Sequence, residues 1–220
     1  MKTIEQYIAE IIDEKDELLF FEFGMYDAYH TYIMLDMIPS SKKFEYHGFE
    51  MIDWLYNQIV DKKKTYANGQ MHLVNKAISD KTGIKKFYKS GGKRDENGQL
   101  KEHYYGSSSI VKPVEVTNVF PAMNFTESQV ECIKLDDYVN ESGLTGKVID
   151  FIWADIQGAE HLLIKGGVNT FKNVRYFYTE YCGKEWYKGN KDAKGIQRML
   201  PYFEVVQDFG GDVLLKNKNL

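Results

Sequence analysis

Short apolar runs separated by amphipathic segments make up most of this chain. The first run, Leu18 to Phe23, follows a helical pattern over residues 3–17 and stops at Gly24. An apolar run of this length that ends at a glycine is typical of a buried parallel strand leading into a turn. Comparable patterns predict further strands at residues 44–49, 71–74, 85–89, 130–135, 148–154 and 175–178.

Apolar residues at helical spacing lie between several of these strands. They predict helices at residues 28–37, 51–60 and 159–165, and the last is closed by a Gly166–Gly167 cap. Strands that alternate with helices indicate an α/β fold with a mostly parallel, doubly wound sheet.

The C-terminal end and one long polar segment complete the organisation. Residues 203–207 and 213–216 predict a closing antiparallel hairpin. Residues 89–109 are polar and glycine-rich without a hydrophobic period, and a loop of this length is usually functional, so we expect it to contact substrate. Because there is no internal repeat or linker, we expect one domain over residues 1–220, with its opening helix in residues 1–17.

Composition narrows the class of protein. A net charge of -4 over 220 residues argues against nucleic-acid binding, and the basic run at residues 62–64 is more typical of a solvated helix end. Cys132 and Cys182 are too few for a disulfide framework or a four-cysteine zinc site. The N-terminus lacks a signal-peptide pattern, and no apolar run reaches the roughly 20 residues that span a bilayer. We therefore expect a cytoplasmic protein, with its oligomeric state open.

Acidic residues stand at the carboxyl ends of four predicted strands: Glu22, Glu50, Asp155 and Glu180. In a doubly wound sheet, ligands bind beyond these ends, where the strand order switches. Several carboxylates on one edge repel one another unless a cationic or hydroxyl-rich ligand lies among them. S-adenosylmethionine provides a sulfonium, an amino group and two ribose hydroxyls, all of which suit carboxylates.

Three segments are candidates for the cofactor side of such a site. Gly24 permits a tight turn, but the full G-x-G-x-x-G of a dinucleotide site is missing, which disfavours a nicotinamide dehydrogenase. Glu50 is placed to accept both ribose hydroxyls, the alternative being a solvated surface side chain. Residues 75–80 fit an adenine slot, with Ser79 or Asp80 as a partner of the amino edge, or an ordinary strand-to-turn junction.

The segment from Ile152 to Glu160 is the most informative. Asp155 follows a central apolar strand and precedes a small-residue turn into a helix, which is a common catalytic position in this architecture. The alternative for Asp155 is the N-cap of that helix. Glu160 lies in the first helical turn and is expected to serve as a cap or to interact with the helix dipole.

These segments together resemble the FkbM-type family of S-adenosylmethionine-dependent methyltransferases. The family signature of an apolar strand, Asp, a Gly-Ala-Glu turn and a helix ending in Leu-Lys-Gly is similar to residues 151–160 and 163–167. Residues 130–138 resemble its Leu-Asp-Asp element, residues 75–88 its adenine-side segment, and residues 107–109 a Ser-rich stretch. The resemblance runs from about Leu18 to Leu214 and implies a Rossmann-like class I methyltransferase fold.

The chain departs from the family pattern at four positions: Glu22 stands where Asp is more common, Ala28 replaces a second Gly, Met51 replaces Pro, and Gln157 replaces Glu. If the family's Glu binds a substrate or an ion, this chain does so differently or not at all.

The resemblance also implies cofactor-binding roles. Glu22, Phe23 and Gly24 are expected near the methionine part of S-adenosylmethionine, with Asp155 near the sulfonium and the acceptor. Glu50 is expected to hold the ribose, and Ala77 and Ile78 to flank the adenine.

A hydroxyl acceptor needs a base or a cation that lowers its pKa. Our hypothesis gives this role to Asp155 with Glu180 beside it, either alone or holding a divalent ion, and keeps His103 as a reserve base. We expect a sugar or glycan hydroxyl as acceptor, with a secondary-metabolite hydroxyl as an alternative. Another alternative is a non-catalytic Rossmann-like module in a glycan-processing complex. Aromatic side chains near the long loop and the tail suit stacking on a sugar ring: Tyr104, Tyr105, Trp186 and Tyr187.

Overall fold

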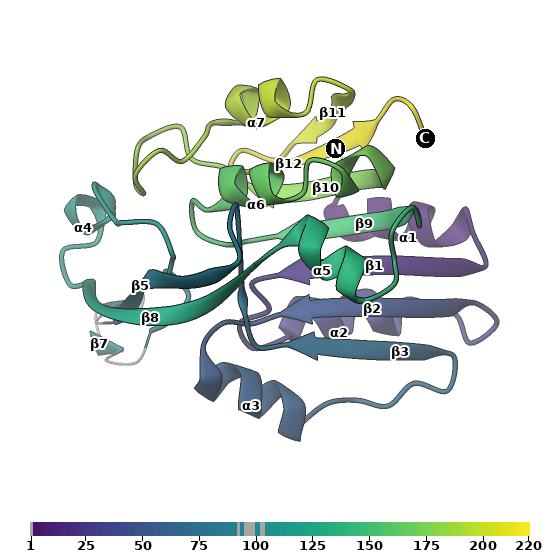
Figure 1. Cartoon of the computed structure of the whole chain (residues 1–220), viewed down its shortest axis with the longest axis horizontal. Coiled ribbons are helices and arrows are strands. Elements are labelled where there is room, and N and C mark those ends of the chain that lie inside the picture. Colours follow the sequence, from purple (N-terminus) through teal and green to yellow (C-terminus); the bar gives the residue numbers. More distant parts are fainter. Residues whose placement is uncertain (1, 92, 95–99, 102–103) are drawn as a thin grey trace.

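The computed structural model describes residues 2–91, 93–94, 100–101 and 104–220 (Figure 1). His103 lies outside these described residues. The first half of the chain forms α1 (Ile4–Asp13), β1 (Glu17–Phe23), α2 (Tyr29–Asp36), β2 (Lys43–Phe49), α3 (Asp53–Asp61), β3 (Gly69–Val74), β4 (Ala77–Ser79), β5 (Gly83–Gly91), β6 (Lys93–Arg94) and β7 (Leu100–Lys101). The second half forms α4 (Val116–Val119), β8 (Asn124–Lys134), α5 (Leu135–Glu141), β9 (Ile149–Ala154), α6 (Glu160–Gly166), η1 (Thr170–Asn173), β10 (Val174–Glu180), α7 (Ala193–Met199), β11 (Phe203–Asp208) and β12 (Asp212–Asn217).

A seven-stranded sheet in the order β11-β12-β10-β9-β1-β2-β3 forms the centre of the molecule (Figure 1). Its strands are parallel except β12, which runs antiparallel to both β10 and β11. The predicted α/β class, the mostly parallel sheet and the C-terminal antiparallel hairpin are therefore confirmed. The chain builds outward from β1 to β3 and then returns to β9 on the other side of β1, so the strand order switches between β1 and β9.

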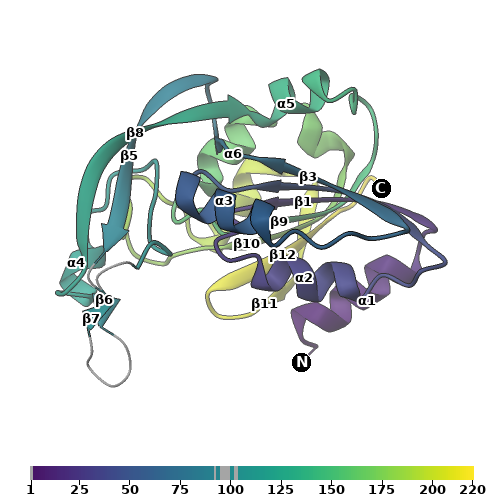
Figure 2. The ribbon, with the colours of Figure 1, turned by 90° about the horizontal axis from the view of Figure 1, so that it is seen from below.

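Helices cover both faces of this sheet, with α1 and α2 on one face and α5 and α6 on the other (Figure 2). Successive residues of β1 supply the two cores, because Phe20 packs with α1 and Phe21 packs on the opposite face. The first helix starts at a capping box, in which Thr3 and Gln6 bond each other's backbone N–H groups. Continuous apolar runs such as β1 thus reflect burial on both faces.

A second sheet, β4-β8-β5, projects from the carboxyl ends of the central strands (Figure 1). Strands β5 and β8 pair antiparallel from Gly83 with Cys132 to Gly91 with Asn124. The predicted strands at residues 85–89 and 130–135 therefore exist but do not belong to the doubly wound sheet, and Leu135 begins α5. Much of this ribbon is exposed, and its alternating pattern carries no information about which sheet it joins.

The predicted loop at residues 89–109 is shorter than expected, because residues 89–91 continue β5 and a short β6–β7 pair follows. In this segment, serine residues hold the end of β5 against residues 107–109 by hydrogen bonds, where other strands use apolar contacts. The Ser90 N–H donates to Ser108 Oγ (3.0 Å), and Ser109 forms a bridge with Tyr88. A polar strand of this kind gives no hydrophobic period, which explains the wrong boundary.

Two glycines close α6 by packing. Gly167 is the C-cap, as predicted, but its φ of −120° is not left-handed. A Cβ on Gly166 would lie 2.0 Å from the carbonyl oxygen of Ser79. The glycines therefore allow α6 to pack closely against β4.

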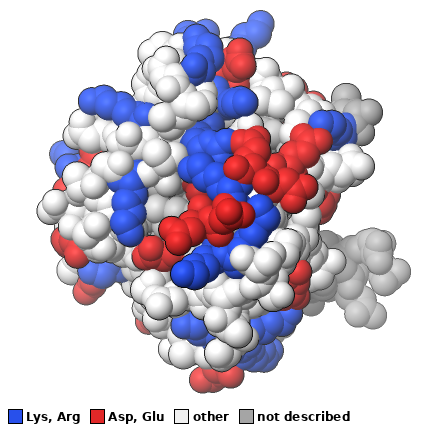
Figure 3. Space-filling view, turned by 90° about the vertical axis from the view of Figure 1, so that its right-hand side faces the viewer, with Lys and Arg blue, Asp and Glu red and all other residues white. Residues whose placement is uncertain are grey.

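The amino-terminal end of the sheet carries interleaved acidic and basic side chains (Figure 3). The buried Asp150 accepts the Leu19 N–H (3.0 Å) and pairs with Lys15 (2.7 Å) and Arg175 (3.1 Å). The charges of these three side chains therefore satisfy one another. Among the residues that the structure describes, no helix is long and apolar enough to cross a membrane.

Candidate active site

A pocket of about 310 Å³ opens at the carboxyl ends of β1, β2 and β9, where the strand order switches. Its volume lies at the lower end of the range for small-molecule sites. All seven residues that the sequence suggested for cofactor binding line it: Glu22, Phe23, Gly24, Glu50, Ala77, Ile78 and Asp155.

Gly24 ties the ends of three strands together. Its N–H donates to the Phe49 carbonyl (3.0 Å), and its φ is +87°. A Cβ at this position would lie 2.0 Å from the carbonyl oxygen of Asp155, so glycine is required by close approach as well as by conformation. Ala28, where the family more often has Gly, also lies in the left-handed region with φ +61°.

Glu22 is a buried carboxylate on the pocket wall, only 2% exposed. The hydroxyl groups of Tyr46 (2.6 Å) and Thr31 (2.7 Å) both donate to its Oε2. Burial raises the pKa of Glu22 to about 7, while these two hydrogen bonds oppose the rise. The side chain is fixed in one orientation and can switch between charged and neutral near neutral pH.

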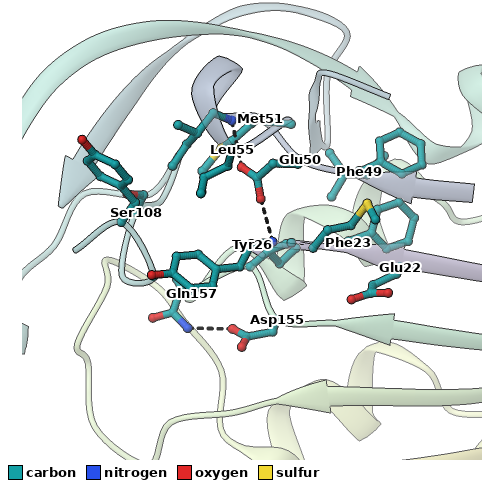
Figure 4. Close-up of a pocket in the computed structure, with 18 of the residues that line it drawn as sticks. Glu22, Phe23, Tyr26, Phe49, Glu50, Met51, Leu55, Ser108, Asp155 and Gln157 are labelled. Carbon is teal, nitrogen blue, oxygen red and sulfur yellow. Dashed lines mark hydrogen bonds between the residues drawn. The ribbon is translucent and has the colours of Figure 1, made fainter. Parts of the chain in front are cut away.

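Glu50 lines the same pocket from the end of β2, with its carboxylate directed at Tyr26 (Figure 4). Its two oxygens accept the backbone N–H groups of Tyr26 (2.9 Å) and Ile52 (2.8 Å). Burial raises the pKa of Glu50 to about 7. The solvated-surface alternative is wrong, since Glu50 is 5% exposed. Each carboxylate oxygen retains a second lone pair for a ligand hydroxyl.

The adenine-side segment divides into two parts. Ala77 and Ile78 line the pocket, whereas Ser79 and Asp80 do not. Both of the latter side chains bind the ammonium group of Lys85 instead. The expectation that one of them reaches an adenine amino group is therefore wrong.

Gln157 links Asp155 to Glu180. Its amide nitrogen donates to Asp155 Oδ1 (2.6 Å) and to Glu180 Oε2 (2.8 Å). Asp155 and Gln157 line the pocket, and Glu180 does not. Desolvation raises the pKa of Asp155, and desolvation together with the neighbouring Asp155 raises the pKa of Glu180. The pair therefore retains a proton to higher pH than isolated carboxyls do.

The N-cap alternative for Asp155 is wrong, because α6 has Ala159 as its N-cap. Glu160 lies in the first turn of α6, as expected, but its Oε1 accepts the N–H groups of Ile156 and Gly158, both at 3.3 Å, which belong to the turn before the helix. Asp155 is consequently available for chemistry. Within the described residues, no third His, Cys, Asp or Glu ligand atom joins Asp155 and Glu180 in a potential metal-binding group. An ion at this pair stays a prediction.

Sequence reasoning missed His30. This residue of α2 lines the pocket, with its ring stacked on Trp153 at 5.1 Å between centroids. His30 is only six residues after Gly24 in the sequence, and this proximity to the predicted turn could have suggested that it lies near the cofactor. Of the proposed sugar-stacking aromatics, Tyr104 and Tyr105 line the pocket, but Tyr187 is 1% exposed and belongs to the core, where its hydroxyl donates to the Ser107 carbonyl (2.7 Å).

The sheet order, the single antiparallel strand β12 and the acid-lined pocket at the switch point define a Rossmann-like class I methyltransferase fold. Residues 24–210 match the family model described as the methyltransferase FkbM domain. The chain belongs to the FkbM methyltransferase family.

Two known proteins are similar to this chain. The 2-O-methyltransferase NoeI of Sinorhizobium fredii (strain NBRC 101917 / NGR234) is 39% identical over 156 residues, which cover 69% of this chain and 61% of that protein. The crystal structure of methyltransferase FkbM from Methylobacillus flagellatus KT has a TM-score of 0.51 at 11% identity, covering 91% of this chain and 44% of that one. The structural likeness supports the fold alone. The match thus spans less than two thirds of each relative's length.

Proposed function

We propose that this chain is an S-adenosylmethionine-dependent O-methyltransferase that acts on a hydroxyl of a sugar or glycan. One observation carries the proposal: Glu22, Glu50 and Asp155, which come from three different strand ends, converge on one pocket. Oxygen as the accepting atom is supported by the name of the relative, which is a 2-O-methyltransferase.

The wall chemistry fits the cofactor. Glu50 would accept the two ribose hydroxyls while its backbone partners hold the carboxylate in place. Gly24 leaves the backbone bare for the methionine part, beside Phe23 and Glu22, and the apolar Ala77 and Ile78 would flank the adenine. S-adenosylmethionine, when bound, supplies the methyl group as an electrophile.

The chain's own contribution to methyl transfer is alignment and proton acceptance. Gln157 holds Asp155 in place through Oδ1, and Asp155 would accept the proton of the acceptor hydroxyl. Since its pKa is raised, Asp155 is a stronger base than an ordinary Asp. His30 lines the same pocket and is a second proton acceptor, ahead of the reserve residue His103.

The rim of the pocket supports a sugar as acceptor. Tyr26 and Tyr29 are 37% and 63% exposed there, and such rings stack on the apolar face of a sugar. Asp27 and Asp155 add acceptors for its hydroxyl groups. The cytoplasmic location remains a prediction.

Calorimetry with S-adenosylhomocysteine tests the cofactor part of the proposal. We expect one site per chain, lost in Glu50→Ala and retained in the control Glu127→Gln, whose target pairs with Lys86 on the surface. If millimolar cofactor does not bind, the chain is a non-catalytic Rossmann-like module. A mass-spectrometric screen of sugars, glycans and secondary-metabolite alcohols for a gain of one methyl group tests the acceptor.

A further inference from the structure

Two histidines and a glutamate gather on one face of the central sheet, outside the pocket. Glu45 and His47 are two residues apart on β2, so their side chains share a face. His72 of β3 is the register partner of His47. None of the three lines the methyl-transfer pocket, and Glu45 and His72 border a hollow at the amino-terminal end of the sheet.

The spacing of their ligand atoms suits a metal ion. Glu45 Oε1 lies 3.1 Å from His47 Nε2 and 3.6 Å from His72 Nε2, and one ligand atom of each residue lies within 4.8 Å of the others. Zinc binds nitrogen and carboxylate oxygen at about 2.0–2.2 Å, which separates two tetrahedral ligands by roughly 3.4 Å. The two distances to Glu45 are therefore already close to those of a bound ion.

His47 is held as a metal-ligating histidine usually is. Its side chain is buried, with its ring stacked between Phe21 (4.7 Å) and His72 (4.6 Å). The Tyr138 hydroxyl lies 2.7 Å from Nδ1, on the side away from Glu45. When Nδ1–H donates to that oxygen, the lone pair of Nε2 faces Glu45. A hydrogen bond of this kind fixes the tautomer and the orientation of a ligand.

Two further features of the cluster bear on ion binding. Lys147 lies 3.6 Å from Glu45 Oε2 and supplies a positive charge to that carboxylate. The planes of His47 and His72 are inclined by only 13°, whereas a metal lies in the plane of each ligand ring. His72 must therefore turn on binding, and its 44% exposed side chain has room to do so.

We propose that Glu45, His47 and His72 form a binding site for one divalent first-row transition ion, which links β2 to β3. Two imidazoles and one carboxylate, with water in the remaining position, suit zinc or cobalt, whereas calcium and magnesium prefer oxygen ligands alone. The site is separate from methyl transfer and does not depend on the function proposed above.

The test titrates Zn²⁺ and Co²⁺ into the full chain, purified without a polyhistidine tag. We expect one ion per chain, a higher melting temperature, and the visible absorption of cobalt in a low-coordination site. His72→Ala and Glu45→Gln each remove the binding. Tyr138→Phe, which deletes only the supporting hydroxyl, weakens it about 10- to 100-fold. Lys147→Gln strengthens it, because the competing cation is gone.

Two control variants separate this site from the pocket acids. The double variant Asp155→Asn/Glu180→Gln and the surface variant Glu127→Gln should bind zinc as the wild type does. A melting curve without zinc shows whether His72→Ala folds. The proposal is overturned if wild type binds no stoichiometric zinc, if His72→Ala and Glu45→Gln bind it unchanged, or if only the pocket variant loses it.

Discussion

Replacing Gln157 by Glu tests the interpretation of the acid pair most directly. In the wild type, the Gln157 amide nitrogen donates hydrogen bonds of 2.6 and 2.8 Å to Asp155 and Glu180. A carboxylate at position 157 turns both into contacts between acidic oxygens. At a separation of 4 Å and an effective dielectric constant of 20, each like-charge pair costs about 4 kcal/mol. Because Asp155 faces the open pocket, we expect a net loss of about 2–4 kcal/mol in the free energy of unfolding.

The pH dependence gives the sign of this effect. The new carboxyl and its neighbours have pKa values raised by folding, so the folded state binds more protons than the unfolded state. Stability is then greatest at low pH and is lost as pH rises through the folded-state pKa values. The difference between Gln157→Glu and wild type should therefore be small at pH 5 and large at pH 8.5.

Urea unfolding of wild type, Gln157→Glu and Gln157→Met across this pH range measures the effect. The Met variant removes the hydrogen-bond donor without adding charge. Methionine, like glutamine, has a Cβ, so the strain of the positive φ of +53° at position 157 should be the same in both. An equal, pH-independent loss in the two variants would refute the electrostatic reasoning.

Four further substitutions test the pocket. Gly24→Ala places a Cβ 2.0 Å from a backbone oxygen at a φ of +87°, so we expect thermal melts to show a loss of about 3 kcal/mol or more. Glu50→Gln should weaken S-adenosylhomocysteine binding roughly 10- to 100-fold by calorimetry. In the wild type, the affinity for S-adenosylhomocysteine should decrease as the pH is lowered through the Glu50 pKa of about 7. The affinity of the Glu50→Gln variant should depend less on pH. Asp155→Asn should lower kcat about 100-fold or more while the cofactor still binds. His30→Gln should lower kcat less. If His30→Gln lowers kcat more than Asp155→Asn does, His30 is the base.

The sequence identified the strands that are buried on both faces and could not assign the ribbon. Strands β1 and β9 have continuous apolar runs, because neither face meets water. The helices α5 and α7 were missed, since each is seven residues long and buries few side chains. Strand β8 shows a strand pattern, but pairing with β5 is a long-range choice that a local pattern does not encode.

The candidate site divides in the same way. Glu22, Glu50 and Asp155 were found because the carboxyl ends of parallel strands must meet at one edge. His30 was missed because its place against Trp153 depends on a strand more than 100 residues away. The bridging role of Gln157 depends on its left-handed backbone conformation. A glycine in the sequence would have indicated such a conformation, but a glutamine does not.

Gln157 also bears on whether methyl transfer uses a metal ion. An ion shared by Asp155 and Glu180 would have to lie between their oxygens, where the Gln157 amide nitrogen now lies. The amide carries only a partial positive charge, so a proton has to offset the remaining repulsion, in agreement with the raised pKa of both acids. A pair that keeps a proton and an amide donor is a poor ligand for a divalent cation. We therefore expect methyl transfer to continue unchanged in a chelator that strips zinc from Glu45, His47 and His72. Loss of turnover in the chelator, restored by magnesium in both wild type and His72→Ala, would show instead that the pocket acids hold the ion.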